Sequence, residues 1–294
     1  MVDFDNNGQI LYQSVGGTTL EAVRRLPCSD SQLALLSAFG LIEWHKEQIR
    51  TTIPVLGPEA AAAVREAAAD AANVALSGVP KSAGEIVEVL ASRGLESSAH
   101  AIVFGHALDG VLWGMLRQRG SLPEIELTVD EPFWRGALWA VYPGREGSAG
   151  TNERTIANAT LVMVWDDESV EALRELESHP GTQELLKTIQ PSETGVSLSP
   201  ILGDDFVVPV VTPDDEIHSI SLALARTVTD AMPDADESRS LLAGAGVDAS
   251  AEEATVIMAH EVIWDVAARL TESGIVDAPA GPTPGGRVFI RIDT

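Results

Sequence analysis

The chain has 294 residues, and 44 Asp and Glu against 19 Lys and Arg give it a formal net charge of −25 and a pI of about 4.4. Because 45% of the residues are hydrophobic, we expect a folded, soluble protein rather than a disordered acidic chain. The negative field repels phosphate, so the composition predicts no binding to nucleic acid and no binding to anionic membranes.

The same field favours a basic protein or another cationic partner, and the alternative is that the charge only maintains solubility. Cys28 is the single cysteine, which excludes an intrachain disulfide. Three lysines against 16 arginines, with many Ala and Gly, suggest the codon bias of a high-GC bacterium. No secretory signal and no run of 18 apolar residues is seen, so we expect a cytoplasmic protein.

The first 120 residues are predicted to be mainly helical after a short hairpin. Residues 1–5 and 9–15 alternate apolar and polar side chains around a turn at 6–8, which is typical of a β-hairpin. Ser29 or Asp30 is expected to begin the first helix. Helices are expected over 31–52, 57–76, 82–92 and 96–118, the last apolar enough to be buried on several sides.

The pattern changes after residue 120. Pro209 is expected to make its strand either an edge strand or a bent strand, and residues 143–155 are expected to form a mobile loop between two strands. The strands are predicted over 124–129, 137–142, 157–165, 206–211 and 287–292. Helices are predicted over 166–177, 182–189, 215–232, 237–243 and 251–273, the last with a capping box of Ser250 and Glu253.

These elements predict an α+β fold, in which an N-terminal helical bundle region packs with a small, mainly antiparallel sheet and further flanking helices. We expect one interlocked unit over residues 1–294, with a helical region at about 27–120 and a sheet-containing region at about 121–294. In this arrangement residues 1–15 pair with 287–293. The alternative is two separable domains with a boundary near 120–123.

A calcium site is one hypothesis for the N-terminus. Asp3, Asp5 and Asn7, followed by Gly8, match the first half of a calcium-binding loop. The bidentate Glu expected at position 12 is replaced by Ser14, and a tight turn explains the same residues without a metal ion.

A divalent metal site is a second hypothesis. His106 and Asp109 are three residues apart on the most apolar helix, whereas Glu261 and Asp265 are four apart on the last long helix, next to His260. Residues at these spacings share a helix face, and facing helices can hold a metal ion between them. The alternative is a core histidine beside carboxylates that face solvent.

Aromatic residues around the predicted strands 137–142 and 157–165, which the loop 143–155 joins into a hairpin, suggest a groove for a partner or ligand. Trp134, Trp139 and Trp165 flank its strands, and Arg145 and Arg154 lie in the loop between them. Indole rings anchor many interfaces, although the same rings also fill cores between sheet and helices.

The sequence contains neither a G-x-S-x-G nucleophile motif nor a phosphate-binding loop. We therefore expect a non-enzymatic, soluble acidic interaction protein, of regulatory or toxin-neutralising type, that binds a basic protein and holds no cofactor. The alternative is a metal-assisted hydrolase or oxidase that uses His and carboxylates on the helices, with a divalent metal ion as cofactor. The sequence does not predict the oligomeric state.

Overall fold

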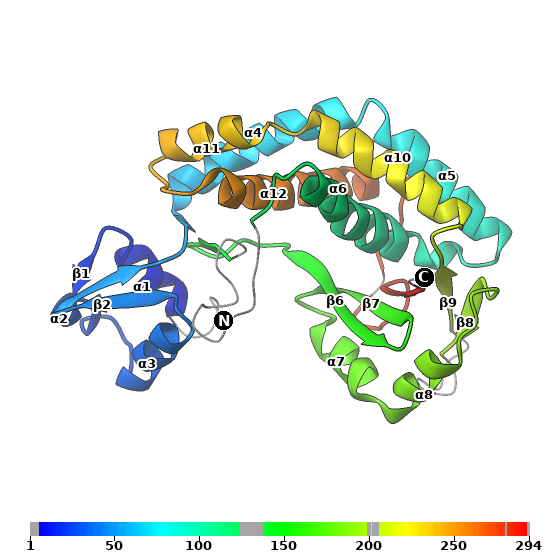
Figure 1. The fold of residues 1–294 in the computed structure, drawn as a ribbon, viewed down its shortest axis with the longest axis horizontal. Helices are drawn as coiled ribbons and strands as arrows, with labels where there is room; N and C mark the ends of the chain where they lie inside the picture. Colours follow the sequence, from blue (N-terminus) through cyan, green and yellow to red (C-terminus); the bar gives the residue numbers. More distant parts are fainter. Residues whose placement is uncertain (1–5, 124–137, 199–200, 202–205, 280, 293–294) are drawn as a thin grey trace. The chain divides into compact units, whose positions relative to one another are not determined.

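The computed structural model describes residues 6–123, 138–198, 201, 206–279 and 281–292 (Figure 1). It confirms the predicted α+β class. The chain divides into two compact units, each made of three segments. Unit 1 contains residues 1–70, 117–146 and 232–261, and unit 2 contains residues 71–116, 147–231 and 262–294.

The N-terminal part of unit 1 is a small α/β module over residues 6–51. A three-stranded antiparallel sheet has the strand order β1-β3-β2, and three helices pack with it. Ile10, Leu33 and Ile49 are among the fully buried residues of its core. The elements in chain order are α1 (Asn7–Gln13), β1 (Thr18–Thr19), α2 (Leu20–Val23), α3 (Asp30–Ala38), β2 (Ile42–His45) and β3 (Gln48–Thr51).

Two predictions for this module are wrong. Residues 9–15 belong mostly to α1, not to a hairpin strand, because the neighbouring Ile10 and Leu11 are both buried, which a strand with one buried face does not allow. The predicted helix over 31–52 ends at Ala38 and gives way to the β2–β3 hairpin. Gly40 has a φ of 67°, and the N–H of Leu41 donates to Leu36 O, a glycine-based helix end.

The rest of unit 1 surrounds a short parallel pair, β4 (Val55–Leu56) with β5 (Ala140–Val141). Helix α4 (Pro58–Ala75) begins in this unit and continues into unit 2, as does α12 (Ala251–Glu272). Helix α11 (Ala235–Gly244) precedes α12. The predicted capping box is confirmed, because Glu253 N donates to Ser250 Oγ and Ser250 N donates to the Glu253 carboxylate.

Unit 2 is built on a five-stranded sheet in which only the β10–β9 pair is parallel. The predicted loop over 143–155 is wrong in its second half, because residues from Ala149 onward form a strand. Pro209 lies in an interior strand rather than at an edge. The strands in sheet order are β6 (Ala149–Ile156), β7 (Ala159–Asp166), β10 (Val288–Ile292), β9 (Val207–Val211) and β8 (Gly195–Ser197).

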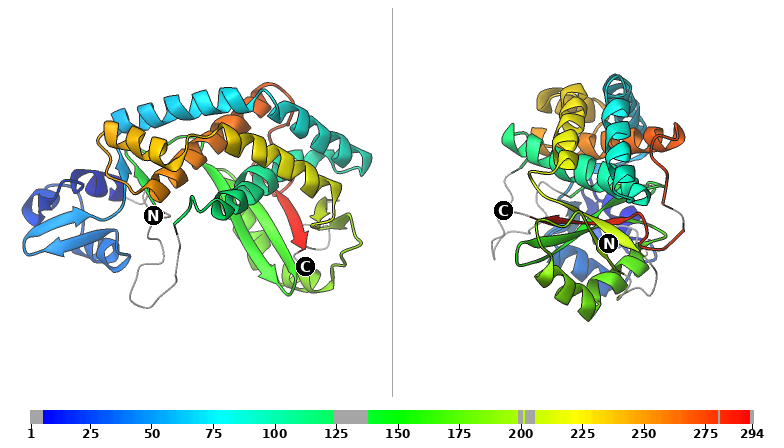
Figure 2. Two further views of the ribbon diagram at one scale, coloured as in Figure 1. Left: turned by 45° about the horizontal axis from the view of Figure 1, so that its top comes forward. Right: turned by 90° about the vertical axis from the view of Figure 1, so that its right-hand side faces the viewer.

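Helices cover both faces of this sheet (Figure 2). Leu161 and Met163 of β7 belong to a core cluster with the helices of one face, and Val164 approaches Gly105 on the other. A side chain at Gly105 would lie 2.7 Å from Val164. The first face carries α7 (Val170–Ser178) and α8 (Pro180–Thr188), and the second carries the π-helix η2 (Ala101–Val111), with α5 (Val79–Ser92) and α10 (Glu216–Ala231) packed on it.

The predicted helix over 96–118 is a 3₁₀ turn (Glu96–Ser98), η2 and α6 (Leu112–Gln118) in succession. Among the described helices, the segment Glu96–Gln118 alone is long and apolar enough to cross a membrane, and most of it is buried inside the fold, as in the core helix of a soluble protein. The described part of 1–15 is not paired with the C-terminal strand. Instead, β10 pairs with β7 and β9.

Candidate functional site

Helices α2 and α3 are joined by a tight turn. The helical hydrogen bonding of α2 continues beyond Val23, because Arg24 N donates to Leu20 O and Leu26 N donates to Val23 O. The connection is therefore only Pro27, Cys28 and Ser29. Proline cannot continue the first helix, and Ser29 begins the second through a capping box with Gln32. The result is a helix-turn-helix in which the N-terminal end of α3 is exposed.

The hairpin that follows α3 projects cationic side chains. His45 pairs with Gln48, so Lys46 and Glu47 form a two-residue loop. Lys46 has a φ of 59°, a conformation that tight hairpin loops require. Lys46 and Arg50 are exposed and make no ion pair with the described part of the chain.

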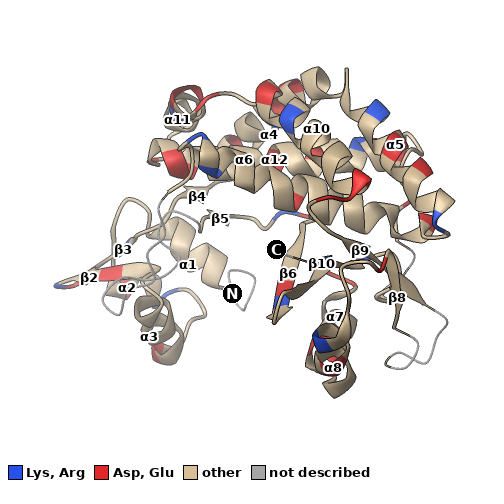
Figure 3. Cartoon of the chain, turned by 45° about the vertical axis from the view of Figure 1, so that its right-hand side comes forward, with Lys and Arg blue, Asp and Glu red and all other residues tan. Residues whose placement is uncertain are grey.

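Negative charge is distributed unevenly along the chain. Residues 1–56 contain six acidic and four basic residues, so only −2 of the net charge of −25 belongs to this segment and −23 to the rest. Figure 3 shows acidic positions on the helices that follow the module, such as α5 and α11. The module therefore has a nearly neutral composition in a strongly acidic protein.

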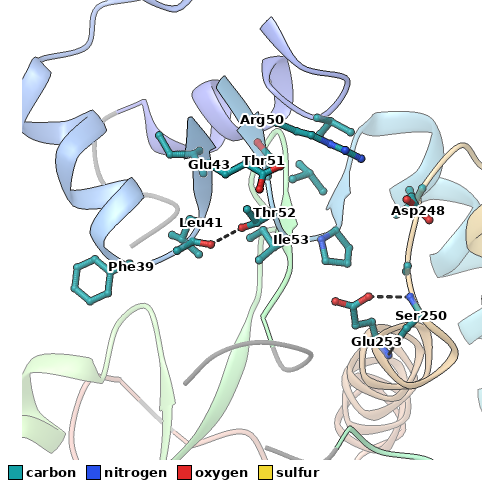
Figure 4. Close-up of a pocket in the computed structure, with 17 residues that line it drawn as sticks. Phe39, Leu41, Glu43, Arg50, Thr51, Thr52, Ile53, Asp248, Ser250 and Glu253 are labelled. Carbon is teal, nitrogen blue, oxygen red and sulfur yellow. Dashed lines mark hydrogen bonds between the residues drawn. The ribbon is translucent and has the colours of Figure 1, made fainter. Parts of the chain in front are cut away.

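Beside the hairpin, unit 1 contains a hollow of about 500 Å³ (Figure 4). Glu43 and Arg50 line it from β2 and β3, Asp248 lines it from the connection between α11 and α12, and Glu253 lines it from the first turn of α12. Apolar residues such as Phe39 and Ile53 complete the lining. The hollow thus combines charges of both signs with apolar surface, which suits binding of a small polar molecule.

The hydroxyl groups at this hollow are used by the fold. Thr51 Oγ1 donates to Leu11 O at 2.7 Å, and Thr52 Oγ1 donates to Gly40 O. An activated nucleophile needs a general base within hydrogen-bond reach, and these hydroxyls bond main-chain carbonyls instead. These two hydroxyls are therefore not placed as activated nucleophiles in the described part of the chain.

The histidine and carboxylate proposed for a divalent metal have other partners. Asp109 accepts from Trp113 Nε1 and from Thr151 Oγ1, both at 2.9 Å. The imidazole of His106 lies 3.2 Å from that of His218. Both residues belong to η2, whose hydrogen bonds close from i to i+5, so residues three apart do not stack as they do on an α-helix.

The remaining metal candidates are also engaged. Glu261 accepts from Arg145 Nε with both oxygens, at 3.2 and 3.0 Å, whereas Asp265 accepts from Arg269 at 2.8 Å. His260 Nδ1 lies 2.8 Å from Val256 O. Among the described residues, no group of three or more His, Cys, Asp or Glu side chains is placed to hold a metal ion. The divalent-metal hypothesis stays a prediction without a described ligand cluster.

The histidine pair of unit 2 is neutral at physiological pH. Burial lowers the pKa of His106 to about 3, and His218 and Arg291 contribute in the same direction. Burial also lowers the pKa of His218. Beside the pair, Arg93 forms a two-bond ion pair with Asp215, at 2.8 and 2.9 Å. His106 is buried and His218 is partly buried, and a hydrogen-bonded pair of neutral imidazoles at the edge of a core is typical of a structural role.

The tryptophans and arginines of the predicted groove are not gathered into one described site. Trp139 and Arg145 belong to unit 1, where the Trp139 ring lies 4.5 Å from the ring of His260. Trp165 and Arg154 belong to unit 2, where Trp165 packs against the core cluster around β7. Trp134 lies outside the described residues.

The described part of the proposed calcium loop is helical. Asn7 begins α1, and its side-chain oxygen accepts from Gln32 Nε2 at 2.7 Å. The expected tight turn at 6–8 is therefore the start of a helix. Asp3 and Asp5 lie outside the described residues.

The α2–α3 pair was not predicted as a site. Its signals in the sequence are Pro27 followed by the Ser29/Gln32 capping box, Gly40, and the hairpin residues around Lys46. Gly40 and the hairpin residues around Lys46 were missed because a helix was predicted through residue 52. Comparison of the chain with protein-family models, with curated proteins and with solved structures gives no match.

Proposed function

We propose that this chain is a non-enzymatic regulatory protein that binds duplex DNA through residues 6–51, a winged helix-turn-helix. One observation carries the proposal. The elements follow the order helix, strand, helix, turn, helix and hairpin, and β3 lies between β1 and β2. In helix-turn-helix proteins the second helix enters the major groove with its N-terminal residues at the base edges, and the first crosses the backbone. Helix α3 is the second helix here.

The expectation of no nucleic-acid binding came from the net charge of the whole chain. That net charge comes almost entirely from the residues after position 56, which carry −23. Phosphate contacts depend on local cations, and charge effects between exposed groups fade beyond about 10 Å at 0.1 M salt. The nearly neutral module can therefore bind DNA, although the rest of the chain opposes close approach and lowers the affinity.

Four cations of the module are available for phosphate contacts. Lys46 and Arg50 are on the hairpin, whereas Arg24 and Arg25 form exposed ion pairs with Asp30 and Glu21, at 2.9 and 3.0 Å. Exposed ion pairs contribute little, so phosphates can replace the carboxylates. Four contacts correspond to a slope of about −3.6 for log K against log salt.

Fluorescence anisotropy of the full chain with a labelled random-sequence duplex, over about 50 to 200 mM salt, tests the proposal. We expect measurable binding at low salt, and a double variant, Lys46→Ala with Arg50→Ala, should weaken it and reduce the slope by about 1.8. The matched control, Lys81→Ala with Lys187→Ala, removes two exposed lysines of unit 2. If both double variants bind alike, or the parent does not bind, the proposal is wrong.

The charge outside the module favours a second function, binding of a basic protein partner. We infer that this interaction would use the acidic helices and not the hairpin. An oligolysine peptide should bind the full chain with an affinity that falls steeply as salt rises, and the hairpin double variant should bind it at least as well as the parent. Salt-independent binding would contradict this function. The metal-assisted hydrolase or oxidase stays an untested prediction.

A further inference from the structure

The exposed face of α3 carries one charged side chain, that of Asp30 at its N-terminal end, which pairs with Arg24 at 2.9 Å. Ser31, Ala34, Leu35 and Ala38 are exposed and share one side of the helix by their spacing of three and four residues. Leu35 is 59% exposed, whereas Leu33 and Leu36 of the same nine-residue helix are buried. The face contains neither lysine nor arginine, so it lacks the side chains that most often recognise guanine.

The amide side chain of α3 is committed to the fold. Gln32 Nε2 donates to Asn7 Oδ1 at 2.7 Å, and its oxygen accepts from Ser29 N at 3.4 Å. Glutamine recognises adenine through both ends of its amide, and here both ends hold α3 to α1 and cap the helix. Bidentate recognition of adenine by Gln32 would require breaking both bonds.

Besides the carboxylate of Asp30, which Arg24 neutralises, the groups on this face are the methyl groups of the two alanines, the isobutyl group of Leu35 and the hydroxyl of Ser31. In the major groove, the C5-methyl of thymine is the apolar group of the base-edge code. The side chains of Leu35 and Ala34 are apolar, so they can make apolar contacts with that methyl group. Ser31 can donate or accept beside them, as serine does with several bases.

Two alternative occupants fit the charges less well. A second copy of the chain would bring another −25 to the surface, and like charges oppose association. A protein that covers Leu35 would leave the exposed cations Lys46 and Arg50 of the same module without a role. Duplex DNA uses both features, the apolar face at the base edges and the cations at the phosphates.

We propose that α3 recognises thymine methyl groups in the major groove, with Leu35 as the residue that determines specificity. This inference rests on the proposed DNA binding. Each methyl buried against Leu35 should strengthen binding about fourfold, the factor that corresponds to burial of one such group. The preferred sites should therefore contain A·T pairs where α3 contacts the duplex.

The experiment begins with selection of bound duplexes from a random pool by the full chain at low salt. Each thymine of the selected sequence is then replaced by deoxyuridine, which removes the methyl group and leaves every hydrogen-bonding group in place. We expect about a fourfold loss of affinity for at least one replacement in the parent. In Leu35→Ala the same replacement should have no effect.

Leu222→Ala is the matched control, because Leu222 is an exposed leucine of α10 in unit 2. It should keep the full sensitivity to deoxyuridine. A second variant, Leu35→Gln, should shift the selected base toward adenine, since glutamine bonds its major-groove edge.

The outcomes separate the two proposals. If no duplex of any sequence binds, the proposed function itself is wrong. If duplexes bind but the selected site is G·C, or deoxyuridine has equal effects in the parent and in Leu35→Ala, the thymine inference is overturned while DNA binding stands. Sedimentation that shows a dimer in the parent and a monomer in Leu35→Ala, with no change in DNA affinity, would assign Leu35 to a subunit contact and overturn the inference.

Discussion

Lowering the pH from 7 to 5 should destabilise unit 2, because two of its histidines are buried in the neutral form. Burial lowers the pKa of His100 to about 4 and that of His106 to about 3. In the unfolded chain both groups titrate near their usual value of 6.5. Above this pH both states hold neutral imidazoles and the stabilisation is complete. As the pH falls below 6.5, the unfolded chain takes up protons that the folded chain does not.

The magnitude follows from these pKa values. At pH 5 the solution is about 1.5 units below the pKa of each histidine in the unfolded chain. Protonation of each histidine therefore stabilises the unfolded state by about 2 kcal/mol, at 1.36 kcal/mol per unit. His100 and His106 together give about 4 kcal/mol, a large part of the stability of a typical domain, and His218, whose pKa burial also lowers, adds to the loss in the same direction. Because the pKa of Asp166 is lowered from 3.8, this carboxyl changes the stability mainly below pH 5.

Urea denaturation at several pH values measures this loss as the change in the free energy of unfolding. In His106→Gln the loss between pH 7 and 5 should be smaller by about 2 kcal/mol than in the parent, although the variant is less stable at every pH. His45→Gln, at an exposed hairpin position, is the control and should keep the parent's pH dependence. An unchanged pH dependence in His106→Gln would refute the argument from burial.

Two further predictions concern stability in unit 1 and use the same assay at pH 7. Glu261→Gln should cost about 3 kcal/mol, because it leaves the guanidinium of Arg145, which is 19% exposed, without its buried carboxylate partner. The control Glu146→Gln, at an exposed position, should change the stability little. A loss under about 1 kcal/mol would contradict a buried ion pair. Gly40→Ala should cost about 1 kcal/mol because the φ of Gly40 is 67°. The control Gly84→Ala, inside α5 with open space around it, should stabilise the protein by about 0.5 kcal/mol. A gain in stability from Gly40→Ala would contradict the glycine-based end of α3.

Local signals in the sequence determined most of the later elements. The helical periodicity after residue 57, together with the Gly and Pro residues at the helix ends, correctly predicted α4, α5, α10, α11 and α12. The capping box at Ser250 formed as predicted, because both of its hydrogen bonds join residues three apart. Such features depend on backbone preferences within one or two turns, so they can be inferred without knowledge of the fold.

The N-terminal module depended on packing that the sequence does not display. The segment 9–15 has alternation that suits a strand, but its two neighbouring apolar residues are buried together against α3 and the sheet, which only a helix allows. Gly40 could have ended the predicted helix at residue 38, since glycine is the usual residue at that position. The apolar residues Ile42 and Ile49 beyond it belong instead to the two strands of the β2–β3 hairpin, where both are buried.

Only the tertiary structure decided which side chains meet. Arg145 and Glu261 are 116 residues apart, and His106 and His218 are 112 apart, so no local pattern predicts either pair. The sequence supplied a net charge for the whole chain, but a charge acts over short distances in salt, and its effect depends on where the fold places it. The composition determined that the protein is acidic and folded, whereas the tertiary structure placed the exposed Leu35 face and the hairpin cations in one nearly neutral module.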